Sequence, residues 1–149
     1  MSFFEKLKGK RPLGVYFESW YSSFTTNANS MDLANIQAPI NLVFLAFVNP
    51  SCTYTKNSMS FLGSGLDFSS SFSVVKQAIS ILKSKGIIVM LSVGGASYQF
   101  DIFNPNNIVD LATDLGVDGI DIDWEPTIGA AKSSQLGGII NILRTKNPT

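Results

Sequence analysis

The chain has 149 residues, and its 11 basic side chains balance its 11 acidic ones, so the formal net charge is zero. A neutral chain is poorly suited to binding nucleic acid through bulk positive charge. Histidine is absent and Cys52 is the single cysteine, which excludes a Ser-His-Asp triad, a histidine-ligated metal site and an internal disulfide. Any acid–base chemistry in this chain must therefore come from carboxylates, tyrosine or lysine.

The first twelve residues are polar and basic, with four basic side chains between Lys6 and Arg11. No apolar stretch of the length of a secretory signal follows them, and the longest apolar runs, around 40–48 and 86–91, are too short to cross a membrane. We therefore expect residues 1–12 to form a solvated basic leader. The protein is expected to be cytoplasmic as encoded, or secreted if the N-terminus is incomplete.

Four short runs rich in β-branched and aromatic residues are predicted to be strands: Leu13–Trp20, Ile40–Val48, Gly86–Val93 and Val117–Trp124. The second and third runs are apolar at nearly every position. This pattern is typical of strands that are covered on both faces, as in a parallel sheet.

Helical spacing of apolar residues separates these runs and predicts helices over Phe72–Lys85, Asn107–Leu115 and Ser133–Arg144, with a shorter one over Met31–Gln37. Residues 49–71 form a long loop rich in Ser, Gly and Asn, and loops of this length are often functional. Strands that alternate with helices indicate an α/β fold. Two architectures remain open, a doubly wound sheet and half of a (β/α)₈ barrel, since a full barrel takes about 250 residues.

The segment Asp118–Glu125 concentrates four carboxylates in eight positions. Side chains alternate between the two faces of a strand, so Asp121, Asp123 and Glu125 share one face. Asp118 has the opposite parity and lies at the start of the strand, so a structural role is expected for it.

Three carboxylates about 6.5–7 Å apart on one face repel one another, and at least one should be driven towards its protonated form near neutral pH. That arrangement suits a general acid. Glu125 is nearest the carboxyl end of the strand, where parallel folds place their active sites, and is the candidate acid. A Mg²⁺ or Mn²⁺ site on the same three carboxylates is an alternative, but no phosphate-binding glycine motif accompanies it.

These residues resemble a known family. Asp118–Glu125 reads D-x-x-D-x-D-x-E, the signature of family-18 glycoside hydrolases, the chitinases and their relatives. Ser92–Gly95 resembles their S-x-G-G motif, Val15–Phe17 with Trp20 resembles their first strand, and Asn41–Phe47 resembles their second. The resemblance covers about residues 13–145 and implies that residues 13–149 are the N-terminal half of the catalytic domain, a (β/α)₈ barrel of which about four βα units are present.

The resemblance implies a role for each carboxylate. Glu125 would protonate the glycosidic oxygen, and Asp123 would orient the N-acetyl group of the substrate, whose carbonyl oxygen attacks the anomeric carbon. Asp121 would be the buried member that shares charge or a proton with Asp123. Ser92 and Tyr16 would hydrogen-bond to Asp121 and stabilise it.

Other side chains are expected around this group. The substrate-binding or supporting positions are Tyr16, Trp20, Phe47, Ser92, Gly94 and Gly95. Trp20 and Tyr21 are candidates for stacking on sugar rings, and Tyr98 and Phe100 for lining the cleft. Trp124 faces away from the carboxylates and is expected to pack in the core.

The expected function is hydrolysis of β-1,4-linked N-acetylglucosamine polymers such as chitin, with retention of configuration and with no cofactor, metal, nucleic acid or membrane span. A non-catalytic, lectin-like binding fragment and an endo-β-N-acetylglucosaminidase are the alternatives. The later strands of the family are absent from these 149 residues, and four barrel strands leave two open edges. Three outcomes are open: a fragment of a longer gene product, which we favour, a half that pairs with a second barrel half or with another copy, and a remnant with little activity.

Overall fold

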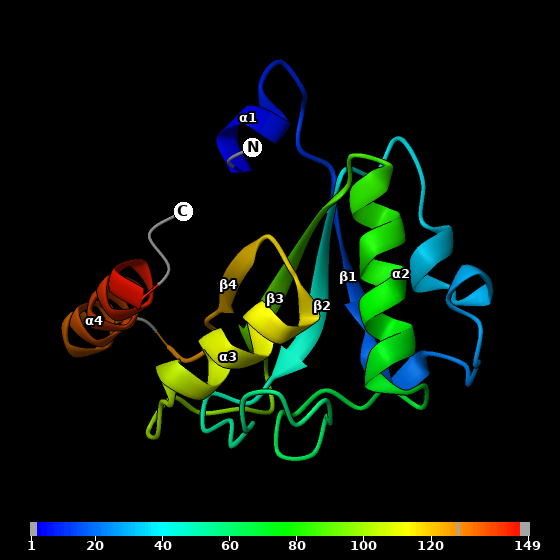
Figure 1. Ribbon diagram of the computed structural model, residues 1–149. Coiled ribbons are helices and arrows are strands. Elements are labelled where there is room, and N and C mark those ends of the chain that lie inside the picture. The colour runs from blue at the N-terminus through cyan, green and yellow to red at the C-terminus, as the bar shows by residue number, and fades with distance from the viewer. Residues whose placement is uncertain (1–2, 128, 147–149) are drawn as a thin grey trace.

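The computed structural model describes residues 3–127 and 129–146. Its strands are β1 (Gly14–Glu18), β2 (Leu42–Val48), β3 (Ile88–Gly94) and β4 (Gly119–Asp123). They form one parallel sheet in the order β1-β2-β3-β4 (Figure 1). All four predicted strands are confirmed, each slightly shorter than its apolar run.

The helices are α1 (Phe3–Leu7), α2 (Phe72–Ser84), α3 (Pro105–Leu115) and α4 (Ala130–Lys146). Helix α2 begins where the Ser71 hydroxyl accepts a hydrogen bond from the Val74 N–H, which satisfies one of the free donors of the first turn. Helix α3 begins with Pro105 in its first turn and ends at Gly116, whose φ of +75° is left-handed. The three longer predicted helices are confirmed.

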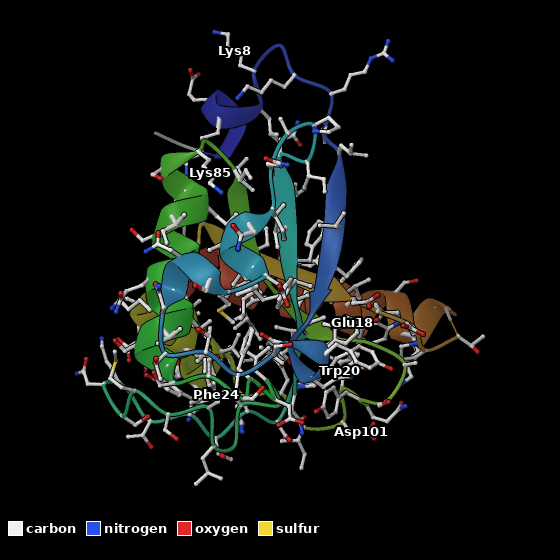
Figure 2. All side chains as sticks on the ribbon, turned by 90° about the vertical axis from the view of Figure 1, so that its right-hand side faces the viewer. Lys8, Glu18, Trp20, Phe24, Lys85 and Asp101 are labelled. Atoms are coloured by element: carbon white, nitrogen blue, oxygen red, sulfur yellow. The ribbon has the colours of Figure 1, made fainter. Side chains whose placement is uncertain are left out.

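The strand order distinguishes the two architectures left open by the sequence. A doubly wound sheet reverses its strand order at a switch point and carries helices on both faces. Here each strand pairs with the next one along the chain, and α2 and α3 lie on the same face of the sheet (Figures 1 and 2). The arrangement is that of four consecutive βα units of a (β/α)₈ barrel.

The core lies between the sheet and the helices. Side chains from the two central strands meet apolar side chains of α2 and α3, and these are almost fully removed from solvent. They include Val43, Leu45, Val89, Leu91, Val75, Ile79, Leu82, Ile108, Leu111 and Leu115.

The opposite face of the sheet is most exposed at the edge strand β1. Tyr16, Phe44 and Met90 lie side by side there in adjacent strands; Tyr16 is 49% exposed, and Phe44 and Met90 are half-buried. In a closed barrel this face points inward. On the same face of β2 and β3, Leu42, Ala46, Ile88 and Ser92 are buried, so the expectation that both faces of these two strands are covered is confirmed, with only Phe44 and Met90 half-buried.

Two predictions are corrected. The short helix predicted over Met31–Gln37 is replaced by a single turn of 3₁₀ helix, Leu33–Asn35, and another such turn, Ala28–Ser30, precedes it. The leader is also not wholly solvated, because Phe3–Leu7 forms α1 and the Lys6 Nζ lies 2.5 Å from Asp118 Oδ1. None of the described helices is both long and apolar enough to cross a membrane.

Candidate active site

The parallel register of β3 and β4 brings the two sequence motifs together. Ser92 pairs with Asp121, and Gly94 pairs with Asp123. Ser92 is fully buried, and its hydroxyl donates a hydrogen bond of 2.7 Å to Asp121 Oδ2. The contact between Ser92 and Asp121 is therefore present as expected, and it fixes one oxygen of the Asp121 carboxylate against the sheet.

The environment of Asp121 changes its acidity. Burial raises the pKa of its carboxyl above the ordinary value, and the negative charge of Asp123 raises it further. The hydrogen bond from Ser92 opposes both effects because it favours the ionised form. The rise places Asp121 among the groups that hold a proton more readily than a free aspartate, which is the behaviour predicted for one member of the carboxylate group.

Glu125 lies two residues beyond the end of β4 and is exposed. It lines a pocket of about 400 Å³ at the carboxyl end of the sheet. The other residues around this pocket are Trp20, Phe47, Gly65, Gly94, Ala96, Ser97 and Tyr98. A carboxyl side chain at the edge of a pocket walled by aromatic rings and backbone is placed to donate a proton to a bound molecule.

Two glycines allow the loop after β3 to pass close to this group. Gly94 has a φ of +117°, and a Cβ there would lie 2.2 Å from the carbonyl oxygen of Asp123. The N–H of Gly95 donates a hydrogen bond of 3.0 Å to that same carbonyl. A Cβ on Gly95, where φ is +86°, would lie 3.0 Å from the ring of Phe47. Only glycine fits both positions without displacing β4 or the pocket wall.

A continuous series of aromatic rings runs from the open face of the sheet to the pocket. Tyr16 stacks on Phe44 with ring centroids 5.0 Å apart and lies 5.6 Å from Phe47, which in turn stacks on Trp20 at 6.1 Å. Burial raises the pKa of the Tyr16 hydroxyl, and the negative charges of Asp121 and Asp123 raise it further. Tyr16 therefore remains protonated and able to donate a hydrogen bond near the carboxylates at neutral pH.

Asp118 has the structural position that its parity predicts. Its Oδ2 accepts the N–H of Val89 at 3.0 Å, and its Oδ1 lies 2.5 Å from Lys6 Nζ and 3.2 Å from Lys83 Nζ. Burial alone would raise the pKa of Asp118, but the hydrogen bonds from Lys6 and Val89 and the charge of Lys83 hold it below the ordinary value. This carboxylate fastens the beginning of β4 to β3, α1 and α2.

Two aromatic residues near the site are packing residues. The Trp124 ring stacks on Phe100 with centroids 4.8 Å apart, so Trp124 packs as expected. Phe100 is buried and is not among the residues around the pocket, so the expectation that it lines the cleft is wrong, whereas Tyr98 does line it. The ring of Phe100 fills the space under Gly94, where an added Cβ would meet it at 3.0 Å.

The long loop contributes a part of the pocket that sequence reasoning missed. Gly65 lines the pocket, and a Cβ there would lie 2.5 Å from the N atom of Asn49. The loop is held to α3 by a hydrogen bond of 2.7 Å from the Tyr54 hydroxyl to Asp114 Oδ2, which also accepts the N–H of Asn57. Loop length alone predicts a functional segment, but nothing in the local sequence distinguishes Gly65 from the other glycines.

A Mg²⁺ or Mn²⁺ site would need Asp121, Asp123 and Glu125 to bring their carboxylate oxygens together around one ion. Among residues 3–127 and 129–146, no group of three carboxylate, histidine or cysteine side chains is placed to hold a metal ion.

Comparisons with known proteins agree with this geometry. The model of the family described as glycosyl hydrolases family 18 matches residues 13–146. A chitinase of Plasmodium falciparum (isolate 3D7) is 31% identical over 135 residues, an alignment that covers 81% of this chain and 34% of the relative.

Solved structures share the fold. A family-18 chitinase from Pseudoalteromonas aurantia superimposes with a TM-score of 0.61 at 20% identity, over 93% of this chain and 52% of that one. One from Chromobacterium violaceum gives 0.58 at 23% identity, over 91% and 37%. A xylanase and alpha-amylase inhibitor protein from Scadoxus multiflorus gives 0.54 at 20% identity, over 93% and 54%. The fold is therefore shared with proteins that are named as inhibitors.

The half barrel is the fold of the family-18 chitinase structures. The chain belongs to glycosyl hydrolase family 18, since the family model spans nearly all of it. It covers about a third of the length of the curated relative and about half of the length of the first solved structure.

Proposed function

We propose that this chain carries the proton-donating half of a chitinase-type active site and cleaves β-1,4-linked N-acetylglucosamine chains with retention of configuration. Glu125 protonates the glycosidic oxygen, and the carbonyl oxygen of the substrate's own N-acetyl group attacks the anomeric carbon. A water then opens the resulting ring, with Glu125 accepting its proton. The observation that carries the proposal is that Glu125 lines a pocket with aromatic walls and lies two residues beyond Asp123, the last residue of β4.

The roles of the two aspartates follow from their surroundings. Asp123 is the nearer of the two to Glu125 along β4 and holds the N-acetyl group in the attacking orientation. Asp121 is held by Ser92 and has a raised pKa, so it exchanges a proton with Asp123 as charge develops. A carboxylate pair that shares one proton can accept a hydrogen bond from the N-acetyl N–H, which orients the group, and can then stabilise the positive charge that develops on it.

The same structure supports a proposal about completion of the barrel. The inner face of the sheet carries the half-exposed ring of Tyr16 beside Phe44 and Met90 and, further along β3 and β4, the Ser92–Asp121 pair. We propose that further β/α strands, from a second barrel half or another copy, cover this face in the working enzyme and complete the walls of the pocket.

Hydrolysis of the chitin tetrasaccharide tests the proposal. Glu125→Gln should lower kcat by about 10²- to 10⁴-fold while sugar binding persists, because only proton transfer is lost. Asp123→Asn should lower the rate about 10²-fold or more through lost positioning. Asp32→Asn, an exposed carboxylate beside the 3₁₀ turn Leu33–Asn35, is the matched control and should behave as wild type. Turnover retained by Glu125→Gln would refute the acid assignment.

The non-catalytic alternative has a distinct outcome in that experiment. The likeness in fold to inhibitor proteins shows that this architecture alone does not guarantee hydrolysis. If wild type and Glu125→Gln bind the tetrasaccharide equally well and neither cleaves it, these 149 residues act by themselves only as a binding fragment, and hydrolysis requires the strands that complete the barrel.

A further inference from the structure

A pocket of about 450 Å³ lies at the amino end of the sheet, and we call it the amino-end pocket. Its walls come from the leader, from the segment before β2 and from the turn between α2 and β3, and include Lys10, Gln37, Pro39, Ile40, Lys85 and Ile87. Figure 2 shows Lys85 at the end of the molecule opposite Trp20. Since active sites of this fold lie at the carboxyl ends of the strands, the amino-end pocket is separate from the candidate active site.

The amino-end pocket carries an excess of positive charge. Two lysines and no acidic side chain line it. In the described part of the chain, no carboxylate lies within ion-pair distance of Lys10 or Lys85. Asp118, at the start of β4, is already paired with Lys6 and Lys83. The charges of Lys10 and Lys85 are therefore available to an anion.

The backbone around Lys10 is fastened to the start of β2. The Asn41 side chain donates a hydrogen bond of 2.9 Å to the Arg11 carbonyl and accepts the N–H of Leu13 at 2.9 Å. On the other side, the N–H of Lys10 donates to the Leu7 carbonyl at 2.9 Å. The exposed Lys10 side chain thus extends from a fixed backbone at the edge of the pocket.

The ammonium group of Lys85 is held in place as well. Its Nζ donates hydrogen bonds of 2.6 Å to the Ala34 carbonyl and 3.4 Å to the Ile36 carbonyl. An ammonium group has three N–H donors, so one remains for a ligand. A cation that is already positioned loses little side-chain entropy when it binds an anion.

The composition of the walls indicates the class of ligand. A phosphate monoester carries about −1.5 to −2 charges at pH 7, which matches two lysines better than the single charge of a carboxylate. Pro39, Ile40 and Ile87 supply an apolar wall, and a pocket of this volume is in the range of those that hold small organic molecules. A nucleic acid would need a longer row of cations.

We propose that the amino-end pocket binds a small organic phosphate ester. Lys10 and Lys85 contact the phosphate oxygens, and the apolar body of the ligand packs on Pro39, Ile40 and Ile87. The proposal goes beyond the proposed function and does not depend on it, because it concerns other residues at the other end of the sheet.

The experiment measures binding of phenyl phosphate to the whole 149-residue chain by amide NMR titration at constant ionic strength, since salt screens exposed charges. Phenol and inorganic phosphate are the comparison ligands. Lys10→Gln/Lys85→Gln removes both pocket charges. Lys8→Gln/Lys76→Gln removes one exposed lysine from the leader and one from α2, neither of which lines the pocket, and is the matched control. Lys10→Gln alone keeps the bonds of Lys85 and serves if the double variant does not fold.

Wild type should bind phenyl phosphate saturably, with shifts at the amides of Ile40 and Ile87, and more tightly than phenol or inorganic phosphate. The Lys10/Lys85 variant should bind it at least about tenfold more weakly, Lys10→Gln alone at least about threefold more weakly, and the control within about twofold of wild type. The proposal is overturned by a lack of saturable binding, by equal losses in the two double variants, or by shifts confined to the pocket that Glu125 lines.

Two further arms distinguish other sources of phosphate. Inorganic phosphate bound as tightly as phenyl phosphate would overturn the organic ligand. Cosedimentation with vesicles of phosphatidylcholine and phosphatidic acid, without saturable binding of phenyl phosphate, would overturn the soluble ester in favour of a lipid headgroup. Hydrolysis of the chitin tetrasaccharide should be the same in the Lys10/Lys85 variant and wild type, so failure of the proposed function and failure of this proposal are read from different measurements.

Discussion

Replacing Ser92 by alanine perturbs the site with the smallest change in shape. Ser92 is fully buried, and its hydroxyl donates a hydrogen bond of 2.7 Å to Asp121 Oδ2. A hydrogen bond to a charged group contributes about 1.5–3 kcal/mol to stability. For a domain of this size that corresponds to a fall in Tm of roughly 4–10 °C.

The loss should depend on pH in a definite direction. The folded-state pKa of Asp121 is raised by burial and by Asp123, so its ionisation destabilises the fold as pH rises from the unfolded pKa of about 3.9 through the folded pKa. The Ser92 bond limits this effect because it favours the ionised form. Without it the folded pKa rises further, so the destabilisation by Ser92→Ala should be largest at neutral pH and smallest below about pH 3.9, where both states are protonated.

Thermal unfolding followed by circular dichroism at pH 7 and pH 3.5 measures this difference. Ser80→Ala, at an exposed position on α2, is the control and should change Tm little at either pH. The reasoning fails if Ser92→Ala lowers Tm equally at both pH values, or by no more than Ser80→Ala.

Two further substitutions probe the frame around the carboxylates. Asp118→Asn should cost about 2 kcal/mol at pH 7 by removing the charge that Lys6 and Lys83 contact. The folded-state pKa of Asp118 is lowered, so this contribution to stability is present above the unfolded pKa and is lost as pH falls through the folded pKa. The denaturant unfolding curves of wild type and Asp118→Asn should therefore converge in acid. A difference between the two curves that widens in acid would contradict this. Gly94→Ala should lower the free energy of unfolding by about 3 kcal/mol, since φ at Gly94 is +117° and the new Cβ would lie 2.2 Å from the Asp123 carbonyl oxygen. Gly138→Ala on α4, where a Cβ meets open space, is the control and should raise it by about 0.5–1 kcal/mol. Equal effects would show that the backbone around Gly94 moves to accommodate the Cβ.

The strands and the longer helices could be predicted because their signals are local. The apolar run that becomes β2 and the glycine that ends α3 each act within a few residues. The shared face of Asp121 and Asp123 follows from the two-residue period of a strand alone. The group of carboxylates at the carboxyl end of β4 is likewise predicted from one local motif, Asp118–Glu125.

The features that could not be predicted depend on contacts between distant segments. The bond of Lys6 to Asp118 joins residues 112 positions apart, so a basic leader of this composition looks solvated until the fold places it beside β4. Phe100 is close in sequence to Tyr98, which lines the pocket, but its ring packs against Gly94 and Trp124 instead. A doubly wound sheet and a barrel differ in the order of their strands within the sheet, and the local sequence of a strand does not specify its neighbours.

The most direct test of the catalytic account is the configuration of the first product. Proton NMR recorded in the first minutes after the chain is mixed with the chitin tetrasaccharide distinguishes the two anomers at the new reducing end. Attack by the N-acetyl oxygen followed by water gives net retention, so the account predicts the β-anomer in excess before mutarotation equalises the two. An initial excess of the α-anomer would mean direct attack by water and would contradict the roles assigned to Asp123 and Glu125.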